Sequence, residues 1–480
     1  MVPAFFHCRQ DSCEVATVPR PRLLASFAFT LCALAPAFVA PAGTVLAHDG
    51  PPTASAAPPA TPVDQQNVTW LSHVDTPGVS GSAVAGLAFM RYPGTSDRDV
   101  MFGDGPFGLG AWSLADPAHP RLLGSVSAAT LALPGDDVAR GFWEGEHLQV
   151  DQARKLVFVT RDPRAYGGTL QTGQLGIYVI DARDPRHLRL VTFHPAPAGH
   201  TSGCIDGCRY LWTGGPFRRI PAEFNGQPAW VTDMKDPAHP VTLPTPVDLK
   251  RDDGTTAYVH STDVDAAGIA WVSGLGGVRG YWTEGRHFDP VAGRVRRATP
   301  TDPVPYAGGK IISPNNSGNI FDHNAWRPLK KFRGFRAGEL LFVTDEDFTD
   351  MCEDAGRLLI VSLAGSFHGE GWRSTPDHPF RLKVVGEFGP VGNPGHQPNT
   401  DCSAHYFDPM PGVGDGNILV EAFYGQGTKF IDVSDPTKPR QVGHFFPQDS
   451  EAAVPAFHDG LVYAGQYSGG IDVIRFTPPR

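Results

Sequence analysis

Short apolar segments, each followed by a polar turn, recur along most of this chain. In the best-preserved copies an apolar segment leads into Asp-x-x-Asp-Pro, and a second apolar segment follows. Apolar runs of this length bounded by Asp, Gly and Pro predict β-strands, and two of them joined by such a turn predict a β-hairpin. A chain that repeats one hairpin is predicted to be a repeat protein. The turns lie at Asp116-Pro117, Asp184-Pro185, Asp236-Pro237 and Asp435-Pro436.

The chemistry of this motif indicates a structural role. Proline after aspartate fixes φ at the value that a turn requires, and the aspartate side chain can accept hydrogen bonds from turn amides. We therefore exclude the aspartates of the motif from the candidate catalytic residues.

The apolar segments group into seven units, of which the last has three strands instead of four. A further strand is expected near residues 67–75, with no hairpin partner close to it in sequence. If this strand completes the last unit, the ring closes and its exposed sheet edges disappear. The sequence thus predicts an all-β fold, a seven-bladed β-propeller closed by an N-terminal strand and spanning residues 67–480. The expected blades cover 83–126, 144–193, 200–247, 258–298, 319–389, 403–446, and 453–476 with 67–75.

Composition and charge agree with this fold and exclude some partners. Gly (55) and Pro (46) are abundant and charged residues make up 19%, as expected for short strands with many turns. The net charge of −10 leaves no basic surface suited to nucleic acid.

The N-terminal region predicts export. Arg20 and Arg22 precede an apolar run at 23–39, and Val45-Leu46-Ala47 is a suitable cleavage site, so residues 1–47 are predicted to form a signal peptide. The alternative is a retained membrane anchor, although the run is rich in Ala and Pro. Residues 48–66 are expected to form a disordered tether. We expect a secreted, cell-envelope or periplasmic protein without a membrane span after cleavage.

Cysteine usage supports the same location. Outside the predicted signal peptide the chain has four cysteines, Cys204, Cys208, Cys352 and Cys402. An even number in an exported protein predicts disulfides. The pairs expected are Cys204 with Cys208 across a hairpin turn, and Cys352 with Cys402.

The repeat is most regular in Gly176-Ile-Tyr-Val-Ile-Asp-Ala-Arg-Asp-Pro, Ser403-Ala-His-Tyr-Phe-Asp, and Lys429-Phe-Ile-Asp-Val-Ser-Asp-Pro-Thr-Lys-Pro. These segments resemble the LVIVD-repeat family of mostly bacterial, often exported β-propeller proteins. The resemblance covers residues 67–476, although the fourth and fifth units depart from the motif. It implies the fold and export, and it brings no established activity or catalytic residues.

Five histidines fall in the first strand of successive units, which lines the central channel of a propeller. Neutral imidazoles that converge there could bind a transition metal such as Cu or Zn. The alternative is a structural network in which the histidines bond to neighbours and water. The histidines are His147, His200, His260, His323 and His405, and the carboxylates expected to support them are Asp263, Asp322, Asp345 and Glu346.

Two functions remain open on this basis. The first is an exported binding or scaffold protein, expected to be a monomer, whose partner is a protein, a glycan or a small molecule. The second is a metal-dependent enzyme, an oxidase for example, with its site in the channel. The chain has no Gly-x-Ser-x-Gly, His-Glu-x-x-His or P-loop motif, so no catalytic residue is assigned and the first function is favoured.

Overall fold

The structure is a computed structural model. It describes residues 62–78, 82–142, 145–215, 229–247, 258–275, 277–290, 292–312, 321–347, 356–364, 381–389, 402–448 and 450–479. The expected signal peptide at 1–47 and most of the expected tether lie outside these residues.

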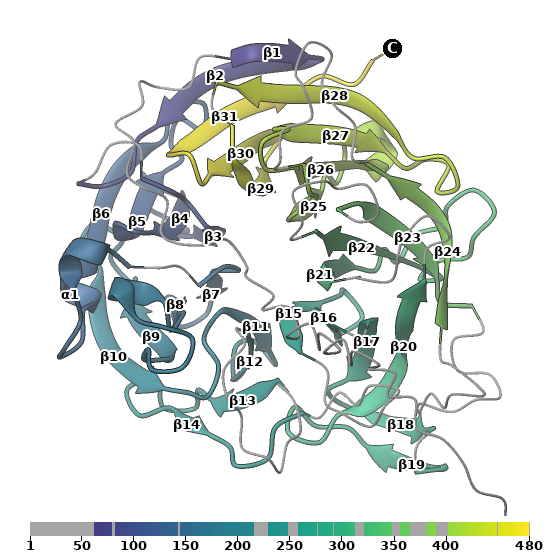
Figure 1. The fold of residues 1–480 in the computed structure, drawn as a ribbon, viewed down its shortest axis with the longest axis horizontal. Helices are drawn as coiled ribbons and strands as arrows, with labels where there is room; N and C mark the ends of the chain where they lie inside the picture. Colours follow the sequence, from purple (N-terminus) through teal and green to yellow (C-terminus); the bar gives the residue numbers. More distant parts are fainter. Residues whose placement is uncertain are drawn as a thin grey trace, which may run out of the picture. The chain divides into compact units, whose positions relative to one another are not determined.

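Seven antiparallel blades surround a centre, and the chain visits them in sequence order (Figure 1). The innermost strand of each blade faces the centre in this view. The predicted all-β, seven-bladed propeller is therefore confirmed.

Blades 1 to 3 each contain four strands that pair in sequence order. They are β3 (Gly86–Arg91), β4 (Asp99–Gly105), β5 (Gly108–Ser113) and β6 (Arg121–Ser127); β7 (Gln149–Asp151), β8 (Leu156–Arg161), β9 (Gly176–Asp181) and β10 (Arg189–Pro195); and β11 (Thr201–Ile205), β12 (Tyr210–Gly214), β13 (Trp230–Asp233) and β14 (Val241–Thr242).

Blades 4 and 5 join into one eight-stranded sheet, because their outermost strands β20 and β24 pair in parallel. The strands are β15 (Val259–Val264), β16 (Ile269–Gly274), β17 (Gly277–Trp282) and β20 (Val304–Ile312) in blade 4, and β21 (Phe321–Trp326), β22 (Leu340–Glu346), β23 (Leu358–Ser362) and β24 (Arg381–Phe388) in blade 5.

The outer strand of blade 4 lies beyond the expected limit of that blade at residue 298. The intervening residues form a separate hairpin of β18 (Arg286–Asp289) and β19 (Arg294–Arg297). The Asp289 carboxylate accepts a hydrogen bond from the Ala292 amide at 3.0 Å, so this turn closes a hairpin of its own and does not continue the blade.

Blades 6 and 7 each gain a strand from the N-terminal part of the chain. They contain β25 (Phe407–Pro409), β26 (Ile418–Ala422), β27 (Thr428–Asp432) and β28 (Arg440–Pro447) with β1 (Pro62–Gln66), and β29 (Ala452–His458), β30 (Leu461–Gln466) and β31 (Ile471–Phe476) with β2 (Val68–Val74).

Strand β2 pairs with β31 from Val68 opposite Phe476 to Val74 opposite Ile471, which closes the ring as predicted. Residues 62–66 were expected to be part of the disordered tether. They instead form β1, which pairs with the edge of β28. An exposed edge offers unpaired backbone groups, and any extended segment can bind them without an apolar pattern of its own.

The remaining elements are short. They are helix α1 (Ala128–Leu131) and the 3₁₀ helices η1 (Val138–Arg140), η2 (Ala165–Gly167) and η3 (Gly414–Gly416). No helix in the described part of the chain reaches the length and apolarity needed to cross a membrane.

The Asp-Pro turns carry the structural chemistry expected of them. The second aspartate of each motif accepts a hydrogen bond from the backbone amide two residues later, at 3.0 Å for Asp184 and Arg186 and at 3.0 Å for Asp236 and Ala238. These carboxylates are committed to their own turns.

The apolar core lies between neighbouring blades. Phe158 and Val179 of blade 2 pack with Leu211 of blade 3, and Phe342 of blade 5 packs with Leu419 of blade 6. Packing between blades leaves the inward-facing ends of the innermost strands free to carry polar side chains.

Candidate metal centre

Four of the five predicted histidines meet in the centre of the ring. His200 directly precedes β11, His260 and His323 lie in β15 and β21, and His405 lies two residues before β25. Their exposed fractions are 1%, 2%, 0% and 0%. We call these residues the four-histidine cluster.

The imidazoles form an arc, because successive blades each supply one ring. The ring centroids are 5.1 Å apart for His200 and His260, 3.9 Å for His260 and His323, and 4.2 Å for His323 and His405. Residues separated by about 60 to 80 positions in sequence thus become direct neighbours.

Glu146 lies against all four imidazoles, just before β7. Its Oε2 is 3.5 Å from the Nε2 of His200, 3.3 Å from that of His260 and 3.4 Å from that of His323. Its Oε1 is 3.7 Å from the Nε2 of His405. Glu146 forms one candidate metal-binding group with His200 and His260 and another with His323 and His405.

A second carboxylate approaches the cluster from blade 5. Glu346, the last residue of β22, has Oε2 3.5 Å from the His323 Nε2 and Oε1 4.0 Å from the His405 Nε2. Glu346 is one of the four supporting carboxylates predicted from the sequence, and its carboxylate lies within 4.0 Å of two imidazoles of the cluster.

Three tyrosines hold these carboxylates. Tyr406 and Tyr467 donate hydrogen bonds to Glu146, at 3.3 and 2.9 Å, and Tyr424 donates to Glu346. Phenolic donors stabilise the charged form of a carboxylate, so both groups are set up to face a positive charge.

The outward nitrogens of three imidazoles are also held. The Nδ1 of His200 lies 3.1 Å from Asp162, that of His260 lies 3.0 Å from the His323 carbonyl, and that of His405 lies 2.7 Å from the Ala453 carbonyl. A partner of this kind on Nδ1 fixes the ring and favours the tautomer with a free Nε2, as seen for histidines that bind metal.

The inward nitrogens lack hydrogen-bond partners. The Nε2 atoms of His200, His323 and His405 are buried without a hydrogen bond to any described residue. Leaving a buried polar atom unsatisfied costs about 1–3 kcal/mol. Three such atoms beside two carboxylates therefore suit a ligand that binds imidazole nitrogen and is attracted by negative charge.

The electrostatics of the cluster are those of a shared positive charge. Burial opposes protonation of His200, but Glu146 and Asp162 outweigh it and raise its pKa to about 10. Burial likewise opposes protonation of His405, and Glu146 and Glu346 raise its pKa. Burial lowers the pKa of His260 to about 4 and lowers that of His323.

Glu146 stays ionised among these groups. Burial would raise its pKa, but His200 and His405 hold it well below the usual range. Asp162 is balanced separately by Arg164, whose Nε lies 2.9 Å from its Oδ1. With neutral imidazoles, the ionised Glu146 would leave negative charge in the cluster, which a bound cation would balance.

His147, the fifth predicted histidine, lies outside the cluster. Its Nε2 is 3.4 Å from Asp263, and these side chains are 25% and 22% exposed. His147 has a φ of 63°, which is unusual for a residue other than glycine. The backbone changes direction at this position, and Glu146 lies against the cluster while His147 does not.

The other predicted carboxylates also lie elsewhere. Asp322 and Asp345 are opposite each other across β21 and β22. Burial raises the pKa of both, and Asp322 further raises that of Asp345. Because successive side chains of a strand point to opposite faces, Asp322 faces away from the side taken by its neighbour His323.

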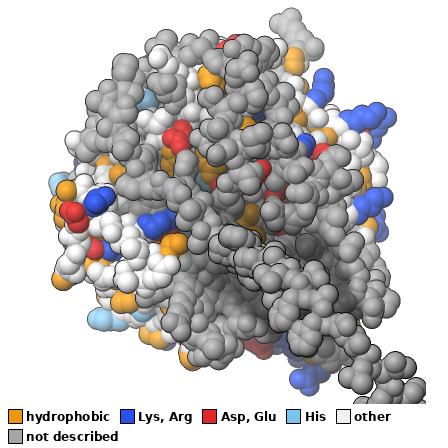
Figure 2. All heavy atoms as spheres, in the orientation of Figure 1, with side chains coloured by type: hydrophobic (Ala, Val, Ile, Leu, Met, Phe, Trp, Pro, Cys, Tyr) orange, Lys and Arg blue, Asp and Glu red, His pale blue; other side chains and the backbone are white. Residues whose placement is uncertain are grey.

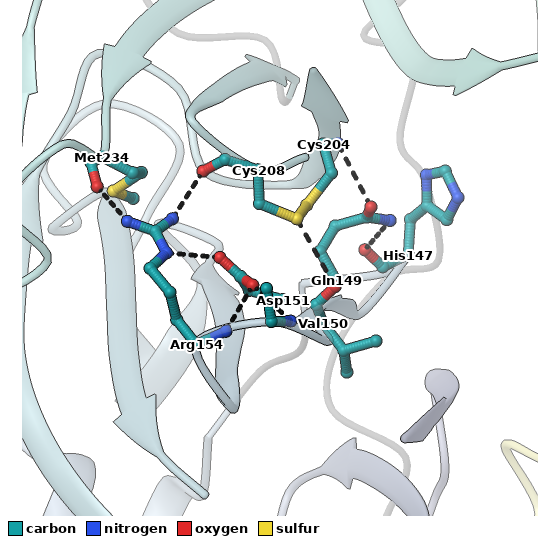
Figure 3. Close-up of a disulfide and its surroundings, with 9 residues drawn as sticks. His147, Gln149, Val150, Asp151, Arg154, Cys204, Cys208 and Met234 are labelled. Atoms are coloured by element: carbon teal, nitrogen blue, oxygen red, sulfur yellow. Dashed lines mark hydrogen bonds and ion pairs between the residues drawn. A yellow bond between two sulfur atoms is a disulfide. The ribbon is translucent and has the colours of Figure 1, made fainter. Parts of the chain in front are cut away.

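The predicted disulfide between Cys204 and Cys208 is present at the turn from β11 to β12 (Figure 3). The Cys204 amide donates to the Gln149 side chain at 3.2 Å, and Arg154 donates to the Cys208 carbonyl at 2.8 Å. The disulfide thus closes a turn of blade 3, and the two hydrogen bonds connect that turn to blade 2. Cys402 is also disulfide-bonded, and its expected partner Cys352 lies outside the described residues.

The surface in Figure 2 shows basic and acidic side chains of the described residues mixed around the rim.

Comparisons with known proteins find only weak structural similarity. No protein-family model and no curated protein matches the chain. A crystal structure of a protein from Lactobacillus plantarum is 10% identical with a TM-score of 0.45, over 79% of this chain and 87% of that one. The periplasmic gluconolactonase PpgL of Pseudomonas aeruginosa is 12% identical with a TM-score of 0.44, over 75% and 85%. The similarity to the LVIVD-repeat family remains a resemblance.

Proposed function

We propose that this protein binds one divalent transition-metal ion through the four-histidine cluster and acts as a metal-dependent enzyme on a small molecule. The observation that carries the proposal is the set of buried Nε2 atoms without hydrogen bonds, gathered around Glu146. Imidazole donors beside carboxylates suit Cu, Fe or Zn.

Each residue of the site has a distinct task in this proposal. The four Nε2 atoms would hold the ion, and Glu146 and Glu346 would balance its charge. Asp162 would orient the His200 ring, and Tyr406, Tyr424 and Tyr467 would orient the carboxylates. A bound ion would supply Lewis-acid or redox chemistry, and four nitrogen ligands leave positions free on a five- or six-coordinate ion.

The competing function is a binding or scaffold protein that needs no metal. It is supported by the propeller fold and by the lack of a known catalytic motif in the sequence. In that case the cluster would be a hydrogen-bonded network with two shared protons, as the raised pKa values of His200 and His405 allow.

Elemental analysis separates these two functions. Protein purified without a polyhistidine tag should contain about one equivalent of Cu, Fe or Zn. The triple variant His200→Ala, His260→Ala, His405→Ala should contain almost none, while the control His147→Ala should retain it. Metal-free wild-type protein that takes up no metal on titration would refute the proposal.

Export and membership of the LVIVD-repeat family complete the proposal. The support for export is the predicted signal peptide and the disulfide-bonded cysteines, since disulfides persist mainly outside the cytoplasm. Cell fractionation with N-terminal sequencing of the mature protein tests it. A chain that stays in the cytoplasm with residues 1–47 attached would contradict it.

A further inference from the structure

A cavity of about 460 Å³ lies beside the four-histidine cluster and is lined from all seven innermost strands. Its lining residues follow the histidines along the strands, for example Asp263 after His260 and Asn324 after His323. Tyr406 lines the cavity and also donates to Glu146. The cavity is reached by solvent, since the His147 and Asp263 side chains at its wall are 25% and 22% exposed.

Three side chains of the cavity wall present acceptor atoms to it. Asp263 uses one carboxylate oxygen to accept from the Ala325 amide at 3.1 Å, and Asp408 uses one to accept from the Phe457 amide at 2.8 Å. Asn324, which is 6% exposed, has an Oδ1 atom with no hydrogen-bond partner among the described residues. We call the space bounded by Asp263, Asn324 and Asp408 the acceptor cavity.

Three polar side chains of the cavity wall already have partners. Gln149 donates to the His147 carbonyl at 3.3 Å, and Tyr406 donates to Glu146. The cationic Arg327 is tied to Asp265 at 2.6 Å. A ligand that satisfies this wall must therefore bring its own hydrogen-bond donors.

The apolar part of the wall includes four aromatic residues. Phe89, Trp326, Phe407 and Phe457 line the cavity, and aromatic faces attract cations as well as apolar groups. The Asp408 carboxylate is half-buried and accepts a hydrogen bond from one backbone amide. Such a carboxylate favours a positively charged ligand.

We propose that the acceptor cavity binds a small organic ammonium ion, with the ammonium group on Asp263, Asp408 and Asn324 Oδ1 and the apolar part against the aromatic wall. An ammonium group carries three donors and no acceptor, which matches the acceptor atoms of these three side chains. This site is defined by its own residues and stands whether or not the four-histidine cluster holds a metal.

Three probes of one size test the charge requirement. They are 2-phenylethylamine, 2-phenylethanol and phenylacetate, titrated by calorimetry into metal-stripped protein at pH 8. The amine should bind, the alcohol should bind about tenfold more weakly or worse, and the acid should not bind. Equal binding of the alcohol or the acid, or no binding of the amine at millimolar concentration, would overturn the proposal.

Variants locate the binding. Asp263→Asn and Asp408→Asn should each weaken amine binding by about tenfold, because each loses a charged acceptor. Asp302→Asn is the matched control, since its side chain is 74% exposed and lies outside the cavity lining. Unchanged thermal unfolding and metal content would show that the cavity variants are folded. Amine affinity that survives in the double variant would place the ligand elsewhere.

Metal analysis of each protein as purified, before the metal is stripped for the titrations, keeps the two proposals apart. A protein that binds the amine but no metal would refute the metal centre alone. A protein that holds the metal and ignores the amine would refute the ammonium site alone.

Discussion

The four-histidine cluster and the acceptor cavity are built from the same innermost strands, yet they differ in burial and in the space between their polar groups. The cluster is closed to solvent and its Nε2 atoms and carboxylates face one another within 3.3 to 4.0 Å. The cavity is open to solvent, and its carboxylates face empty space of about 460 Å³. The cavity therefore has room for a small molecule, whereas the groups of the cluster lie close together.

The difference shows that the position of a residue along a strand decides which of the two sites its side chain joins. One residue step turns a side chain to the opposite face, and two or three steps carry it about 7 to 10 Å along the strand. His260 and Asp263 are three positions apart on β15, and one belongs to the cluster and the other to the cavity. Blade 6 repeats this offset, with Asp408 three positions after His405, whereas in blade 5 Asn324 directly follows His323. The propeller so assembles two sites from one set of strands.

Opening the ring should have the largest effect, because both sites depend on the same closure. Deletion of residues 67–75 removes β2, the outermost strand of blade 7. We expect a sharp fall in thermal stability and loss of both metal and amine binding, measured by calorimetry and elemental analysis.

Deletion of residues 62–66 is the matched control for this experiment. It removes β1, which is a fifth strand at the outer edge of blade 6. Its effect should be much smaller, and both sites should survive. Full stability of the 67–75 deletion would show that β2 is dispensable for closure.

Changing Glu146 should separate the two sites. Glu146→Gln removes the charge that lies against four Nε2 atoms. Metal affinity should fall by about 10- to 100-fold, as for residues that support metal ligands, and the affinity for 2-phenylethylamine should not change. Competition with a metal chelator measures the first and calorimetry the second. An equal loss of both would mean that the sites are one.

A pair of tyrosine variants sharpens the comparison further. Tyr406 and Tyr467 both donate to Glu146, and of the two Tyr406 lines the cavity. Loss of either hydroxyl should weaken metal binding by about threefold to tenfold. Tyr406→Phe should also alter amine affinity, while Tyr467→Phe should leave it unchanged. Identical amine affinities in the two variants would argue against contact between ligand and Tyr406.

The smallest effect should be on the pH dependence of stability. Burial raises the pKa of Asp408 from 3.8 to about 7. Between pH 4 and 7 the unfolded chain loses this proton while the folded chain keeps it, so the folded protein loses stability as pH rises through that window. Asp408→Asn should make this decline shallower in urea unfolding at several pH values, whereas Asp302→Asn should not. A slope unchanged from the wild type would contradict the raised pKa.

Much of the fold could be predicted because its signal is repeated. Four Asp-Pro turns marked the hairpins, and a three-stranded last unit implied closure by a distant strand. The extra hairpin β18–β19 and the edge strand β1 could not be predicted. Neither follows the repeat. The hairpin β18–β19 pairs only within itself, and β1 pairs with β28 through backbone groups.

The site was predictable to the extent that it follows the strand pattern. His200, His260, His323 and His405 occupy equivalent places at the start of innermost strands, and they converge. Glu146 was missed in favour of its neighbour His147, because the positive φ at His147 changes which residue faces inward and no sequence pattern marks it. Asp408 was missed because its importance comes from a cavity that seven strands form together.

The closing strand also has a consequence for how the protein is made. The Trp70 side chain donates to Asp472, across a separation of 402 residues. Contacts that distant in sequence form late in folding, and until residues 471–476 have been synthesised the ring has no means to shut. The parts of the centre, from Glu146 to Tyr467, are scattered over most of that length. A growing chain therefore forms blades before the four-histidine cluster is complete, so the metal of the proposed site would bind only after the ring has closed.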